Sequence, residues 1–144
     1  MSINPLNSEA NKVVVHYKNG GVIKGMTLDF VAEKPKFHLT HTDQRIEEID
    51  TESAKAIFFV KSFEGNKDYK EPKDFTGVNP KDLRGLKVKV IFQDNETILG
   101  STLGYNKQRK GFFILPLDPQ SNNIRIYVVA SAVKEIKLGS LADK

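Results

Sequence analysis

The sequence predicts a mainly β protein: two tandem five-stranded antiparallel small barrels, each preceded by a short helical turn. Three observations favour this fold class. The chain repeats itself, short stretches alternate apolar and polar residues, and each repeat carries a glycine in the middle of a predicted strand. A chain of 144 residues ordinarily forms one domain, but units of roughly 60 residues bury only about 60% of their unfolded surface. We therefore expect the two repeats to pack on each other.

The repeat relates the two halves of the chain by a shift of 75 positions. The pairs that share this shift include Asn4/Asn79, Pro5/Pro80, Val13/Val88, Val15/Val90, Gly25/Gly100, Leu28/Leu103 and Phe37/Phe112. Inserted residues raise the shift to 78 and then to 79 in the last two predicted strands. Because a duplicated sequence indicates a duplicated structural unit, we expect domains at 1–60 and 79–144, joined by the segment 61–78.

The individual elements follow from local patterns. Asn-Pro opens each repeat, and Asn caps helices while Pro suits their first turn, so short helical turns are predicted at 4–10 and 79–84. Alternation with a period of two then predicts half-buried strands. These lie near 13–17, 22–30, 37–40, 46–49 and 55–60, and again near 88–92, 97–105, 112–115, 124–129 and 134–138. Turns are predicted at 18–21, which carries an Asn-Gly hairpin signal, and at 93–96.

Gly25 and Gly100 lie in the middle of the second predicted strand of each repeat. Glycine weakens a strand unless the chain bends sharply or another backbone comes close. A small barrel needs such a bend, so we assign both glycines a structural role. Replacement of either one by Val is expected to destabilise the fold strongly.

A helical turn followed by five short strands with a glycine-bent second strand resembles the Sm-like small β-barrel, and SH3-like barrels share the pattern. The resemblance covers 4–60 and 79–138. The chain also resembles uncharacterised bacterial doubled-barrel proteins, some of them associated with PilZ signalling domains, which implies a bacterial regulatory setting. The residues that bind RNA in Sm-like proteins and the arginine pair of PilZ domains are absent. The resemblance therefore transfers no functional residue to this chain.

The segment 61–78 carries three aromatic residues spaced six apart, Phe63, Tyr69 and Phe75. A flexible linker has no need of such side chains. We expect an ordered strap whose rings pack on one or both barrels. The alternative is a disordered linker.

A basic loop in the second repeat is a candidate contact for RNA or DNA. The net charge is +4, and residues 86–138 carry eight basic and four acidic side chains. Candidate contacts are Tyr105, Lys107, Arg109, Lys110 and Arg125. An aromatic ring among cations can stack a base and hold phosphates. The alternative is a solvated loop in which Tyr105 closes the barrel end, as Phe30 does in the first repeat.

Apolar outer-face residues of the second repeat are a candidate interface. Ile91, Phe113 and Leu115 are expected to face outward, where the first repeat has polar residues. Exposed apolar clusters indicate an interface, here with the first repeat, the strap or a partner protein. Small barrels also have open edges at their fourth and fifth strands, which allow internal pairing, self-association or capture of a partner strand.

Other classes of function find little support in the sequence. The chain has no Cys, and its three His residues show no zinc-binding pattern. No nucleophile elbow, P-loop or dinucleotide fingerprint is present, so we expect no enzymatic activity, metal or cofactor. No secretory signal or apolar run of membrane-spanning length is seen, which favours the cytoplasm and no membrane contact. We predict a non-enzymatic protein-interaction or adaptor module; the alternative is an RNA- or DNA-binding protein.

Overall fold

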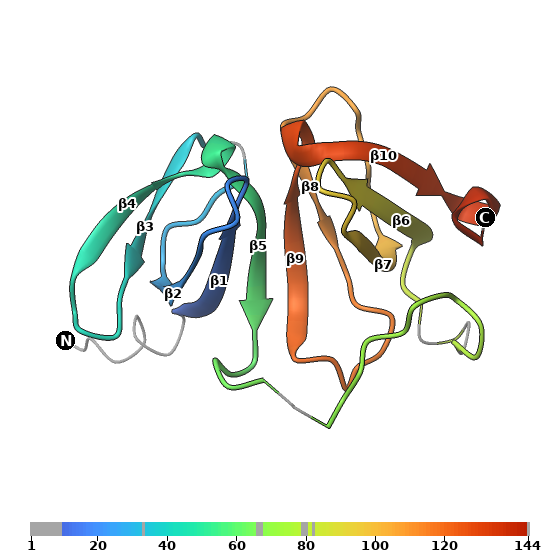
Figure 1. Cartoon of the computed structure of the whole chain (residues 1–144), viewed down its shortest axis with the longest axis horizontal. Coiled ribbons are helices and arrows are strands. Elements are labelled where there is room, and N and C mark those ends of the chain that lie inside the picture. Colours follow the sequence, from blue (N-terminus) through green and yellow to red (C-terminus); the bar gives the residue numbers. More distant parts are fainter. Residues whose placement is uncertain (1–9, 33, 66–67, 79–80, 82, 144) are drawn as a thin grey trace.

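The computed structural model describes residues 10–32, 34–65, 68–78, 81 and 83–143, and these form a mainly β protein with two sheets, which confirms the predicted class (Figure 1). The strands are β1 (Asn11–Tyr17), β2 (Val22–Thr27), β3 (Lys36–Thr40), β4 (Ile46–Asp50), β5 (Ala54–Val60), β6 (Leu86–Phe92), β7 (Thr97–Thr102), β8 (Gly111–Ile114), β9 (Asn123–Val129) and β10 (Val133–Leu138). The helical turn predicted at 4–10 lies outside the described residues except for residue 10, and residues 79, 80 and 82 of the turn predicted at 79–84 lie outside them too. In the part of the chain that is described, no helix is long and apolar enough to cross a membrane.

The two repeats share one strand order. The larger sheet runs β4-β3-β2-β1-β5-β9-β8 and the smaller one runs β10-β6-β7. A single bridge between Ser101 and Leu115 connects β7 to β8. The first repeat therefore has the order β4-β3-β2-β1-β5, and the second has the matching order β9-β8-β7-β6-β10. Within the described ranges neither repeat closes into a barrel.

The first hairpin of each repeat turns through a residue with positive φ. Gly20 has a φ of 93° and its repeat equivalent Asn95 has a φ of 71°. Glycine adopts this region freely, and Asn does so more readily than most other residues. The amide of Tyr17 donates to the carbonyl of Gly21 over 2.8 Å, closing the turn. The hairpin predicted at 18–21 is therefore present, as a three-residue turn over 18–20 in which Gly20 takes the positive-φ position.

The two repeats are joined by the antiparallel pairing of β5 with β9, at the centre of Figure 1. Because side chains alternate along a strand, each of these strands presents one set of residues to each side. One core contains Ile57 and Phe59 of β5 with Tyr127 and Val129 of β9, and the other contains Ala56 of β5 with Ile126 and Val128 of β9. The β5–β9 pair is thus a wall that both hydrophobic cores share.

Polar contacts tie the same junction together at one end. The side chain of Lys55 on β5 is almost fully buried and reaches the turn between β6 and β7. Its Nζ lies 2.8 Å from Asp94 and also contacts Glu96. Burial acts to lower the pKa of Lys55, but the hydrogen bonds to these two carboxylates raise it above its ordinary value. A buried cation with two partners fixes the second repeat against β5.

The described part of the segment 61–78 contacts both repeats. Ser62 exchanges hydrogen bonds with Asn122 of the second repeat, at 3.1 and 2.9 Å. The ring centroid of Phe75 lies 5.1 Å from the Nζ atom of Lys87. The Nζ atom of Lys24 in the first repeat donates to the carbonyl of Phe63 over 3.1 Å. The aromatic rings of this segment are half-buried, while most of its other residues are exposed.

The mid-strand glycines allow the next strand to approach closely. A Cβ atom at Gly25 would lie 2.6 Å from the carbonyl oxygen of Thr40, and one at Gly100 would lie 2.5 Å from that of Leu115. Contacts this short with backbone cannot be relieved by a side-chain rotation. The glycines are therefore required for the contact of β2 with β3 and of β7 with β8.

Gly100→Val is expected to lower the free energy of unfolding by about 3 kcal/mol or more, because the added atoms overlap the neighbouring strand. Chemical denaturation followed by far-UV circular dichroism measures this change. Gly104→Ala is the matched control, since no atom lies within 4 Å of the added Cβ; its effect should stay within about 0.5 kcal/mol. Equal stability of the two variants would contradict the close-approach explanation.

Candidate functional site

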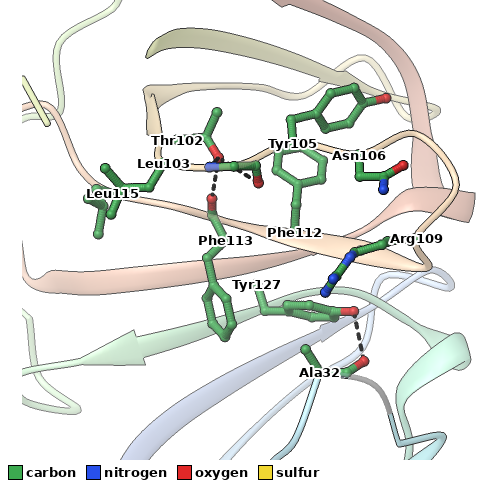
Figure 2. Close-up of a pocket in the computed structure, with 12 residues that line it drawn as sticks. Ala32, Thr102, Leu103, Tyr105, Asn106, Arg109, Phe112, Phe113, Leu115 and Tyr127 are labelled. Atoms are coloured by element: carbon green, nitrogen blue, oxygen red, sulfur yellow. Dashed lines mark hydrogen bonds between the residues drawn. The ribbon is translucent and has the colours of Figure 1, made fainter. Parts of the chain in front are cut away.

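A cavity of about 540 Å³ lies where β7 and β8 separate, beyond the Ser101–Leu115 bridge. We call it the cleft; Figure 2 shows its lining. Its lining residues are Ala32, Thr102, Leu103, Gly104, Tyr105, Asn106, Arg109, Gly111, Phe112, Phe113, Leu115 and Tyr127. Most of these belong to the second repeat. The Tyr127 hydroxyl donates to the carbonyl of Ala32 over 3.2 Å, which links the cleft to the first repeat.

Tyr105 is half-buried at one wall of the cleft. Its ring packs edge-on against Phe112, with centroids 5.0 Å apart and planes at 81°. In the first repeat Phe30 packs against Phe37 in the same way, at 5.2 Å and 80°. Tyr105 thus takes the place of Phe30 in the second repeat, so one part of its ring is already committed to packing.

Phe113 packs against the first repeat. Its ring centroid lies 6.2 Å from that of Phe30, 6.0 Å from that of Phe59 and 5.2 Å from that of Tyr127. The guanidinium carbon of Arg125 lies 4.3 Å from the Phe59 centroid and 4.5 Å from the Phe113 centroid. Cation–π contacts of this kind are favourable when partly desolvated. Phe113 is therefore part of the contact between the repeats.

The predicted nucleic-acid residues divide into two groups. Lys107, Arg109 and Lys110 are exposed on the loop 104–111, and Figure 2 shows the Arg109 side chain directed toward Tyr127. Arg125 is held between two rings, and burial lowers its pKa. Because Arg125 lies four residues along β9 from the residue that pairs with Gly111, it is about 13 Å from this loop. The structure does not bring Arg125 to the basic loop.

The predicted apolar interface residues also separate. Leu115 lines the cleft. Phe113 lines the cleft too, but its ring contacts the first repeat. Ile91 lies on β6, paired with Thr97 of β7 and Glu135 of β10. Leu103, which the sequence reasoning missed, is 78% exposed at the mouth of the cleft.

The first repeat has a hollow of about 850 Å³ at the equivalent place, and there a carboxylate caps the open strand. Asp29 Oδ1 accepts hydrogen bonds from the backbone amide of His38 over 2.9 Å and from the hydroxyl of Thr27 over 3.2 Å. Asp29 Oδ2 lies 2.7 Å from His38 Nδ1. Burial acts to raise the pKa of Asp29, but these hydrogen bonds lower it below its ordinary value. The Asp29 carboxylate thus accepts the hydrogen bond of the His38 backbone amide, which pairs with no residue of β2.

The second repeat has no such carboxylate, because Gly104 stands where Asp29 stands in the first repeat. Its Thr102 hydroxyl donates instead to the carbonyl of Phe113 over 3.0 Å. The amide of Ala130 donates to the carbonyl of Lys110 over 2.8 Å. Because backbone groups alternate in direction along a strand, those of the even-numbered β8 residues bond to β9 and those of the odd-numbered residues point toward β7. The amide of Phe113 therefore points into the gap between β7 and β8, where the cleft lies. The sequence held a signal for this difference between the repeats, since Asp29 and Gly104 stand at equivalent positions.

The described residues offer little for a metal ion. His38 pairs with Asp29, and His41 Nε2 lies 2.7 Å from Glu47. In the described part of the chain, no three His, Asp or Glu side chains come together as a metal site. The distinctive feature is the cleft, with its apolar walls, an inward-facing amide and cations on the adjoining loop.

Asp29→Asn is expected to weaken the dependence of stability on acid pH. The folded-state pKa of Asp29 lies below its unfolded value, so its ionised form stabilises the fold above about pH 4, and this contribution is lost as pH falls through the folded pKa. Melting temperatures measured between about pH 6 and pH 2 should fall less steeply for the variant. Glu64→Gln, at an exposed carboxylate of the segment 61–78, is the control. Parallel profiles for Asp29→Asn and the original chain would contradict the capping role.

Comparison with known proteins identifies a family and no individual relative. No curated protein and no solved structure is significantly similar to the chain. A family model described as a family of unknown function, DUF6982, matches residues 9–140. This match spans both repeats, from β1 to η4 (Gly139–Asp143). The chain therefore belongs to the DUF6982 family.

Proposed function

We propose that this chain is a non-enzymatic protein-interaction module that binds an extended segment of a partner protein in the cleft. The observation that carries the proposal is the exposed apolar mouth of the cleft, where Leu103 is 78% exposed beside Leu115 and Tyr105. A large apolar side chain in this setting gains stability when a partner covers it. Apolar walls with a few polar groups are the usual composition of binding sites.

The open strand beside the cleft supports an extended partner. Among the residues that the structure describes, β8 has no neighbouring strand on the side of β7 beyond the Ser101–Leu115 bridge. Backbone groups on such an open edge can pair with a partner segment, whose side chains then enter adjacent pockets. The outer edge of β8 is short, which limits the contact to a few residues.

We also propose that each repeat is an opened small barrel of the Sm-like or SH3-like kind. The shared strand order and the glycines at the close approach of the second and third strands support this assignment. In this proposal, the gap between those strands is the place where the barrel opens and a ligand enters. A bacterial regulatory role follows only from the resemblance in sequence.

Leu103→Asp is expected to abolish partner binding, because a carboxylate at the mouth of the cleft removes its apolar surface. The immobilised chain and the variant are compared for proteins captured from extracts of the cell that produces the chain. Leu28→Asp is the matched control, since Leu28 is the repeat equivalent and is 60% exposed. Loss of the same captured proteins with both variants, or with neither, would contradict binding at the cleft.

Nucleic-acid binding is a second candidate, favoured by the exposed cations Lys107, Arg109 and Lys110. The triple change of these residues to Ala should abolish mobility shifts of mixed RNA and DNA at low salt, and any residual binding should depend less on salt. Lys34→Ala/Lys36→Ala in the equivalent loop of the first repeat is the control. Unchanged affinity of the triple variant would exclude this loop as the contact.

A further inference from the structure

We propose that the cleft recognises a carboxylate, the side chain of an Asp or Glu in the partner segment. This carboxylate would take the position relative to β8 that the Asp29 carboxylate takes relative to β3 in the first repeat. The inference rests on the proposed function, since it names the chemistry of the protein segment that enters the cleft. It is drawn from the comparison of the two repeats.

The donor set of the first repeat is present in the second. Thr27 corresponds to Thr102 and His38 corresponds to Phe113 at the shift of 75 positions. In the first repeat the Thr27 hydroxyl and the His38 amide both donate to Asp29. The Thr102 hydroxyl and the Phe113 amide lie on the equivalent strands, β7 and β8, where the hydroxyl bonds to the Phe113 carbonyl and to the backbone of Gly104. A rotation of the Thr102 hydroxyl away from the Phe113 carbonyl would complete the pair of donors.

The acceptor is what the second repeat lacks. Gly104 has no side chain, and a Cβ atom placed there meets no atom within 4 Å. The space that the Asp29 side chain uses in the first repeat is therefore open in the second. An unpaired amide at a partly buried position costs free energy that a ligand oxygen recovers.

The loop charges point to an anion rather than a neutral acceptor. In the sequence, the first repeat's loop 29–36 contains two acids and two bases, whereas the loop 104–111 contains no acid and three bases. The second loop thus has no carboxylate and carries one more base than the first. Because these cations are exposed to solvent, their attraction for a bound carboxylate should weaken as the salt concentration rises.

The first experiment supplies the missing carboxylate within the chain. Gly104→Asp should place an acid next to the Phe113 amide, so hydrogen exchange of that amide should slow to the rate of the His38 amide. The melting temperature should hold or rise. Gly104→Ala is the matched control and should leave the exchange of Phe113 unchanged. Rapid exchange of Phe113 in a folded Gly104→Asp variant would overturn the proposal.

The second experiment supplies the carboxylate from outside. The probe is the peptide acetyl-Leu-Asp-Leu-amide, compared with acetyl-Leu-Asn-Leu-amide, and the readout is the ¹H–¹⁵N shift of Phe113 during titration. We expect the Asp peptide to bind at least about tenfold more tightly, since hydrogen bonds to charged acceptors are the stronger ones. Gly104→Asp should lose this binding and Gly104→Ala should keep it.

The outcomes separate this inference from the proposed function. If both peptides bind equally and Leu103→Asp abolishes both, the cleft binds protein segments but does not select a carboxylate, and the inference fails alone. If neither peptide moves the Phe113 signal while the cellular partner is still captured through Leu103, the inference is also wrong. If neither peptide binds and Leu103→Asp has no effect on capture, both proposals fail.

Discussion

The pairing of β5 with β9 is the interaction on which the rest of the structure depends. Each repeat has about 60 residues, too few to build a large core alone. Both strands therefore give alternate side chains to two cores, with Ile57 and Tyr127 on one side and Ala56 and Val128 on the other. Loss of this pairing would expose both cores at once.

The strands that pair inside the molecule differ in character from their free equivalents. β5 and β9 are largely buried and apolar. Their repeat equivalents β10 and β4 form the outer edges of the two sheets and carry several charges. These charged residues are Glu47, Glu48, Asp50, Lys134, Glu135 and Lys137. Charges on an edge strand discourage further strand pairing. Each repeat therefore pairs with the other through its apolar edge strand, and its charged edge strand stays at the outside.

The two repeats also differ at the gap between their second and third strands. In the first repeat the gap between the second and third strands is capped from within, by Asp29 on the amide of His38. In the second repeat Gly104 removes the cap, and the adjoining loop gains cations. Phe113, the equivalent of His38, turns its ring to the first repeat and its amide to the gap. The junction of the repeats and the proposed binding site therefore share one residue.

The sequence by itself determined the duplication, the mainly β class, the turns and the mid-strand glycines, because each depends on local patterns or on self-similarity. It also paired Tyr105 with Phe30, and the structure gives both rings the same edge-on packing. Only the tertiary structure decided which strand edges meet, since the sequence left internal pairing, self-association and capture of a partner strand open for the fourth and fifth strands. That pairing drew Arg125 between Phe59 and Phe113 and away from the basic loop, and it joined Ala32 to the wall of the cleft through Tyr127. The contacts of Arg125 with Phe59 and of Tyr127 with Ala32 link residues 66 and 95 positions apart, and local spacing cannot foresee them.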